Sequence, residues 1–121
     1  MGWKKLSPEV AVVLEKAIEP FDCLKRTMFG YPAFFVNNNM WTGVFEDRIF
    51  IRLSARDRER IFSAETEAVV FQPMTGRAMK EYVELPPSLY KSADFETWLK
   101  RSYDYVSSLA PKEPKGRKPK N

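Results

Sequence analysis

The chain has no histidine and a single cysteine, Cys23, among its 121 residues. Without histidine, neither a Ser-His or Cys-His nucleophile pair nor a histidine-containing metal site can form. One cysteine permits no disulfide within the chain, which suits a reducing compartment. Lys25 and Arg26 favour a thiolate slightly, but a small buried side chain is the simpler role for Cys23. We therefore expect no enzymatic activity, no catalytic residue, no cofactor and no metal.

Long hydrophobic runs are also missing. No apolar stretch approaches the ~20 residues that a membrane-spanning helix needs. The first nine residues, MGWKKLSPE, include two lysines but no apolar segment after them, so we expect no secretory signal. Hydrophobic residues make up 44% of the chain and charged residues 30%, as in ordinary globular proteins. These features predict a single globular domain in the cytoplasm.

The positive charge is unevenly placed. The net charge is +4, yet residues 1–111 hold 15 basic and 15 acidic side chains. The whole excess lies in the last ten residues, where Glu113 accompanies five cations: Lys112, Lys115, Arg117, Lys118 and Lys120. We predict a folded domain over residues 1–110 and a disordered, Pro- and Lys-rich tail over 111–121. The tail either binds nucleic acid without sequence preference or simply keeps the protein soluble.

Residues 28–53 are the most β-prone part of the chain. Aromatic and branched apolar residues dominate this stretch, and polar breaks at 37–39 and 46–47 divide it into three antiparallel strands. In the third strand, apolar residues alternate with Arg48, Phe50 and Arg52. Side chains alternate between the two faces of a strand, so one face is apolar and the other mixes aromatics with arginines. We expect helices to cover the apolar face and a partner to use the mixed one.

The remaining elements complete a two-layer arrangement. Ser7-Pro8-Glu9 begins an amphipathic helix, and Ser54 begins a shorter one. Strands over 68–71 and 79–85 flank a turn in which Gly76 supplies a positive φ, and a helix capped by Ser92 ends before Pro111. The fold class is therefore α+β, with helices on a five-stranded antiparallel sheet. The predicted order is helix, three strands, short helix, two strands, helix.

Several short motifs occur in a characteristic order: RTMFG at 26–30, MWTG at 40–43, DRIFIR at 47–52 and FQPMTGRAMKEY at 71–82. With them, the chain resembles the N-terminal domain of the TfoX (Sxy) competence-regulator family over about residues 6–109. The resemblance implies an α+β fold and a stand-alone member of a bacterial regulatory family. Larger members add a second domain and help a transcription factor to activate DNA-uptake genes. The family has no agreed catalytic residues to carry over.

The motif residues supply the candidate sites. We expect a binding site for a protein partner or an anion, formed by Arg26, Trp41, Arg48, Arg52, Arg77 and Tyr82. Two competing explanations stay open: the arginines pair with Glu46, Glu81 or Glu84, and the aromatics pack in the core instead of stacking on bases. The predicted function is a non-enzymatic regulatory or interaction module acting through a protein partner. The alternative is a nucleic-acid-binding accessory protein that uses its basic tail. The sequence predicts neither the partner nor the oligomeric state.

Overall fold

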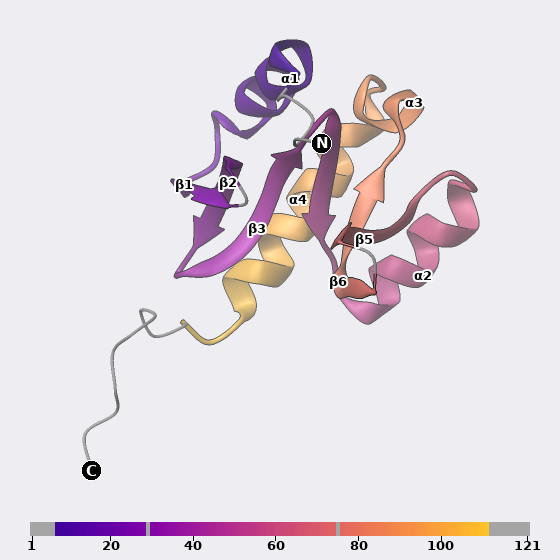
Figure 1. Cartoon of the computed structure of the whole chain (residues 1–121). Helices are drawn as coiled ribbons and strands as arrows, with labels where there is room; N and C mark the ends of the chain where they lie inside the picture. Colours follow the sequence, from indigo (N-terminus) through magenta and orange to yellow (C-terminus); the bar gives the residue numbers. More distant parts are fainter. Residues whose placement is uncertain (1–6, 29, 75, 112–121) are drawn as a thin grey trace.

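The computed structural model describes residues 7–28, 30–74 and 76–111, which form one sheet and four helices (Figure 1). In chain order the elements are α1 (Pro8–Ile18), β1 (Leu24–Met28), β2 (Tyr31–Val36), β3 (Asn39–Phe45), β4 (Arg48–Arg52), α2 (Ala55–Ala64), β5 (Val69–Met74), β6 (Arg77–Leu85), α3 (Pro87–Tyr90) and α4 (Asp94–Ser108). None of the helices in these residues is long and apolar enough to cross a membrane.

The sheet has six strands, in the order β1-β2-β3-β4-β6-β5, and every neighbouring pair is antiparallel. The α+β class is confirmed, but the predicted five strands and element order are wrong. β1 was missed because its residues are almost all exposed and show no alternation of apolar and polar side chains. The short helix α3 is absent from the predicted order; Pro87 occupies its first helical position.

The helices pack on one face of the sheet, where the larger hydrophobic core lies. The helix starts predicted at Ser7 and Ser54 are confirmed, since their side chains accept hydrogen bonds from the backbone N–H groups of Val10 and Asp57. The cap predicted at Ser92 is wrong by one residue, because α4 begins at Asp94 after Ala93, although the Ser92 hydroxyl accepts from the Asp94 N–H. The core joins residues of all four helices to the inward side chains of the central strands, including Leu14, Ile61, Leu89, Leu99, Ile49 and Ile51. In Figure 1, α4 runs behind the sheet. The apolar face is therefore the helix-covered face, as predicted.

A second buried cluster occupies the opposite face and contains only strand residues. Its members are Tyr31, Ala33, Met40, Phe45, Phe50, Phe71 and Tyr82, with Met28, Phe35 and Met79 partly buried beside them. In a flat sheet β3 and β5 would stand about 14 Å apart, because three spacings of ~4.8 Å separate them. The rings of Phe45 and Phe71 nevertheless meet with centroids 5.5 Å apart. The sheet is therefore curled, and this side is called the concave face below.

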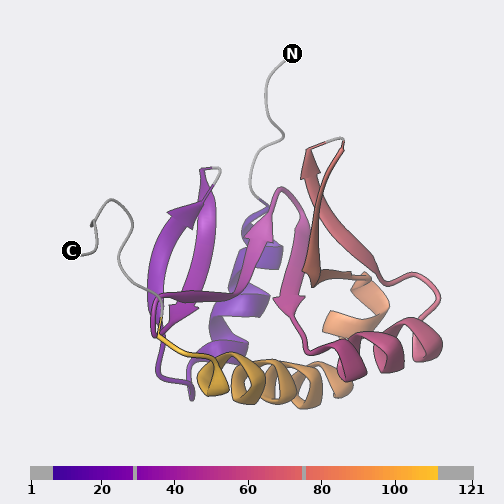
Figure 2. The same cartoon turned by 90° about the horizontal axis from the view of Figure 1, so that it is seen from below.

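The outer hairpins border the concave face. Figure 2 shows the β1–β2 and β5–β6 hairpins extending away from the helix layer, on either side of β3 and β4. This curvature buries aromatic side chains without a covering helix, because the hairpins themselves shield them.

Candidate functional site

The four arginines of the matching motifs belong to one face. Residues that lie opposite each other in neighbouring strands share a face, as do residues two apart in one strand. By this rule all four belong to the concave face: Arg26 lies opposite Ala33, Arg48 opposite Phe45, Arg52 opposite Tyr82, and Arg77 two residues before Met79. The fold thus places on one face residues that are up to 51 positions apart in the sequence.

The two central arginines are neutralised by glutamates. Arg48 donates from Nη2 to Glu46 at 2.9 Å and from Nη1 to Glu84 at 2.8 Å. Arg52 donates from Nε to Glu81 at 2.7 Å. The pairing with glutamate that the sequence left open is therefore confirmed for both. An anion that bound here would have to displace these carboxylates.

The two outer arginines, Arg26 and Arg77, have different surroundings from the two central ones. The Nη2 group of Arg26 donates to Asn38 at 2.8 Å, and its guanidinium lies 5.1 Å from the centre of the Phe35 ring. Arg77 is exposed at the start of β6, on the opposite arm of the sheet. Within the described part of the chain, neither makes an ion pair with a carboxylate. These two cations are the ones that a negatively charged group can reach.

The aromatic side chains of the concave face form a continuous row from β2 to β6. Neighbouring rings in the order Tyr31, Phe45, Phe71, Phe50, Tyr82 have centroids between 4.3 and 5.9 Å apart. The three phenylalanines in the row are at most 2% exposed. Core packing therefore accounts for them, and they offer no free ring face for a base.

Tyr82 anchors one end of this row. Its hydroxyl donates to the carbonyl oxygen of Met40 at 3.1 Å, across the face, and the Arg52 guanidinium lies 5.4 Å from its ring centre. Burial raises the pKa of Tyr82 to about 12, although the Arg52 charge acts in the opposite direction. Tyr82 is thus a neutral, hydrogen-bonded phenol on the concave face.

Trp41 lies on the other side of the sheet, so its predicted place in the site is wrong. It is 0% exposed and packs edge-on against the rings of Phe21 and Tyr103, in the helix-covered core. The cause is an irregularity in the β2–β3 pairing: Phe34 lies opposite Thr42 but Phe35 lies opposite Met40, which leaves Trp41 as an extra residue. Such a bulge changes the face on which the following side chains lie.

Gly30 and Gly76 are turn residues whose backbone conformation requires glycine. Gly30 and Gly76 have φ angles of +83° and +81°, and a Cβ at either position would meet nothing within 4 Å. The hairpin role predicted for Gly76 is confirmed. At Gly30 there is room for a side chain, and the positive φ is what favours glycine.

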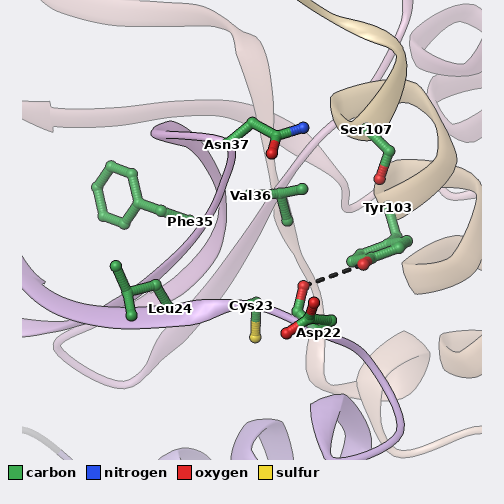
Figure 3. A pocket seen from close by; sticks show the side chains of 8 residues that line it. All are labelled: Asp22, Cys23, Leu24, Phe35, Val36, Asn37, Tyr103 and Ser107. Atoms are coloured by element: carbon green, nitrogen blue, oxygen red, sulfur yellow. Dashed lines mark hydrogen bonds between the residues drawn. The ribbon is translucent and has the colours of Figure 1, made fainter. Parts of the chain in front are cut away.

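Cys23 lines a separate cavity of about 310 Å³ between the start of β1 and the end of α4 (Figure 3). The Tyr103 hydroxyl donates to the backbone carbonyl of Asp22 at 3.0 Å on one side of it, and Asn37 and Ser107 provide further polar groups. Burial, assisted by the Asp22 charge, raises the pKa of the Cys23 thiol. The slightly favoured thiolate that the sequence suggested is therefore wrong, since the raised pKa favours the protonated thiol.

Other candidate chemistry is limited. Among residues 7–28, 30–74 and 76–111, no group of three or more cysteine or acidic side chains could hold a metal ion. The predicted nucleic-acid tail, Lys112, Lys115, Arg117, Lys118 and Lys120, lies outside the described residues.

Comparison with known families accounts for the clustering of the motifs. The model of the TfoX N-terminal domain matches residues 19–106, a span that includes every strand and all four arginines of the concave face. The chain belongs to the TfoX N-terminal domain family. No curated protein matches the chain. The TfoX N-terminal domain motifs therefore fall on the curled sheet and its hairpins.

Sequence reasoning missed part of the site. Leu24 and Met28 of β1, together with Met74 of β5, extend the concave face with exposed or half-exposed apolar side chains. The sequence signal for β1 was the close spacing of Met28 and Tyr31. Only two residues separate them, and the second is Gly30, as in a tight two-residue hairpin turn.

Proposed function

We propose that this TfoX N-terminal domain is a non-enzymatic regulatory module that binds an acidic segment of a protein partner on its concave face. One observation carries the proposal: Arg26 and Arg77, on opposite arms of the face, have no carboxylate partner in the described chain. The central cations on the same face are already neutralised. Carboxylates on the partner complement the outer pair, because the guanidinium fork suits carboxylate geometry.

The surroundings of these arginines support a protein partner. Apolar side chains lie close to both: Met28 and Phe35 are half-buried near Arg26, and Met74 is 43% exposed opposite Arg77. A surface that combines arginines with methionine and aromatic side chains is typical of protein interfaces. The non-enzymatic part of the proposal is supported by the absence of histidine from the sequence and by the raised pKa of its one thiol.

The proposal is tested by capturing proteins from a lysate of the source organism on immobilised full-length chain. We expect Arg26→Glu with Arg77→Glu to reduce capture of the partner by about ten-fold, since like charges then face its carboxylates. Two substitutions of the same charge on exposed helix positions, Arg60→Glu and Lys100→Glu, serve as the matched control and should leave capture unchanged. If every captured protein binds both double variants equally, the concave face is not the binding surface.

A second function rests on the position of the charge. The five cations of the last ten residues carry the whole net charge of the protein, so they can condense on nucleic acid. A chain ending at Pro111, compared with the full chain in nuclease-treated and untreated lysate, tests this alternative. Nucleic acid captured only by the full chain, with strong salt dependence, would favour it.

A further inference from the structure

The two edges of the sheet differ in their capacity to accept another strand. β5, at one edge, contains Pro73, and its pairing with β6 shifts register twice. Proline and bulges are the usual protection of an edge against pairing. β1, at the other edge, has no proline, and its five residues pair with β2 in one unbroken register. β1 is therefore the edge with regular geometry for strand addition.

The register of β1 also shows which backbone groups face outward. Thr27 lies opposite Pro32, which has no N–H to donate. In a hydrogen-bonded antiparallel pair, each residue donates its N–H to the carbonyl of the other. Pro32 cannot donate, so Thr27 and Pro32 form a non-hydrogen-bonded pair. By alternation, the N–H and C=O groups of Thr27 and Lys25 point away from β2, toward the free edge. No backbone bond beyond the sheet engages residues 24–28 within the described chain.

The side chains of β1 decide between a second copy and a different partner. Antiparallel pairing of β1 with itself must bring the outward-facing residues opposite each other. Pairing Lys25 with Thr27 places Arg26 opposite Arg26, and pairing Lys25 with Lys25 places two lysines opposite each other; like charges directly opposite destabilise a sheet. A strand with two consecutive acidic residues would instead complement both cations. Leu24, which is 56% exposed, and Met28 at the strand ends suit apolar neighbours.

The existing contacts of the two cations do not prevent this pairing. Lys25 contacts Glu15 at 2.9 Å, but the two side chains are 58% and 46% exposed, so water screens the pair. Arg26 is exposed and keeps donor groups beyond the one that bonds to Asn38.

We propose that β1 accepts an extended segment of an acidic partner as a seventh strand. The segment pairs with the backbone of Lys25 and Thr27 and places two consecutive carboxylates opposite Lys25 and Arg26. This inference rests on the proposed function and names its partner: an acidic segment with apolar residues on either side. The added strand extends the concave face, because Arg26 belongs to the edge strand β1 and also to that face.

The test uses a capped synthetic peptide, Val-Thr-Glu-Glu-Val, and amide hydrogen exchange followed by NMR on the full chain. At a peptide concentration about nine times Kd, exchange of the Lys25 and Thr27 amides should slow about ten-fold, because only the free fraction exchanges. The Arg26 amide, which already faces β2, should not change. A control peptide, Val-Thr-Lys-Lys-Val, should not bind.

Two variants separate strand addition from simple charge attraction. Thr27→Pro removes one outward N–H without removing a bond to β2, and it should weaken binding about ten-fold. If that variant proves misfolded, Lys25→Glu with Arg26→Glu gives an independent answer: it should lose the acidic peptide and gain the lysine peptide. Arg60→Glu, at an exposed position of α2, should leave peptide binding unchanged, whereas Arg77→Glu should lower capture of the partner from lysate. Peptide binding without protection of Lys25 and Thr27, or no binding at millimolar peptide, overturns the strand-addition proposal and leaves the Arg77 result to decide the proposed function.

Discussion

At the scale of single residues, Gly43 shows how tightly the curled sheet is packed. A Cβ at this position would lie 2.7 Å from Cζ of Phe50, 2.9 Å from the Pro32 carbonyl oxygen and 3.1 Å from Cα of Ala33. Two of these neighbours are backbone atoms that cannot move independently. We expect Gly43→Ala to lower the free energy of unfolding by about 1–3 kcal/mol, measured by urea denaturation.

Phe50 provides the internal control for this prediction. If the ring is part of the obstacle, Phe50→Leu should be less costly in the Gly43→Ala background than alone, since the shorter side chain relieves one contact. Strict additivity of the two substitutions, or a neutral Gly43→Ala, would contradict the close approach.

Cys23 gives a second residue-scale prediction. Because burial and the Asp22 charge raise the pKa of the thiol, alkylation by iodoacetamide at neutral pH should be slower than that of a free cysteine. The rate should keep rising with pH beyond the range in which free cysteine saturates. Asp22→Asn removes one of the two causes and should move the pH profile toward lower pH, whereas the distant Glu59→Gln should not. A profile like that of free cysteine would show that the thiol is solvated.

At the scale of elements, α2 is fixed to α4 by one ion pair. Oδ1 of Asp57 accepts a hydrogen bond from Nη2 of Arg101 at 2.7 Å. The Asp57 side chain is only 10% exposed. We expect Asp57→Ala to lower stability by about 1.5–3 kcal/mol, because a buried hydrogen bond to a charged group is lost.

The Lys100–Asp104 pair on α4 is the matched comparison. Its side chains are 67% and 62% exposed, and its atoms are 3.4 Å apart. Asp104→Ala should therefore cost no more than about 0.5 kcal/mol. Equal costs for the two alanine variants in thermal denaturation would mean that burial does not strengthen the Asp57–Arg101 pair.

The same elements show what the sequence could predict. The caps at Ser7 and Ser54 are local, so their residues were sufficient to place the helix starts. Alternation also placed Arg48 and Arg52 on one face correctly, because β4 is regular. It failed for Trp41, since a bulge depends on how two strands pair, and for β1, since an edge strand has no buried side to produce a pattern. The placement of Arg26 and Arg77 on opposite arms of one face depended on strand order, which periodicity cannot supply.

At the scale of the whole molecule, two hydrophobic cores on opposite faces of one sheet stabilise the fold. The helix-covered core is built from aliphatic and aromatic side chains of many elements, whereas the concave core depends on curvature and on a few rings. Tyr82 connects the ends of the concave core, from β6 to the start of β3, through its bond to Met40. Its ionisation should therefore be coupled to global unfolding.

The pH dependence follows from the raised pKa of Tyr82, about 12 in the folded protein against an ordinary value of 10. Below pH 10 the phenol is protonated in both states and its contribution is fully present. Between pH 10 and 12 the unfolded chain releases the proton while the folded chain keeps it, so stability falls as pH rises. The loss from this residue should be on the order of 2–3 kcal/mol by pH 12.

Tyr82→Phe isolates this contribution, because it removes the ionisable group and keeps the ring beside Phe50. At neutral pH the variant should lose about 1 kcal/mol with the bond to Met40. Between pH 10 and 12 its free energy of unfolding should then fall less steeply than that of the unmodified chain, so that the two curves converge and cross before pH 12. Parallel curves across this range would show that the phenol of Tyr82 ionises as readily in the folded protein as in the unfolded one, and that the concave core does not exclude water from it.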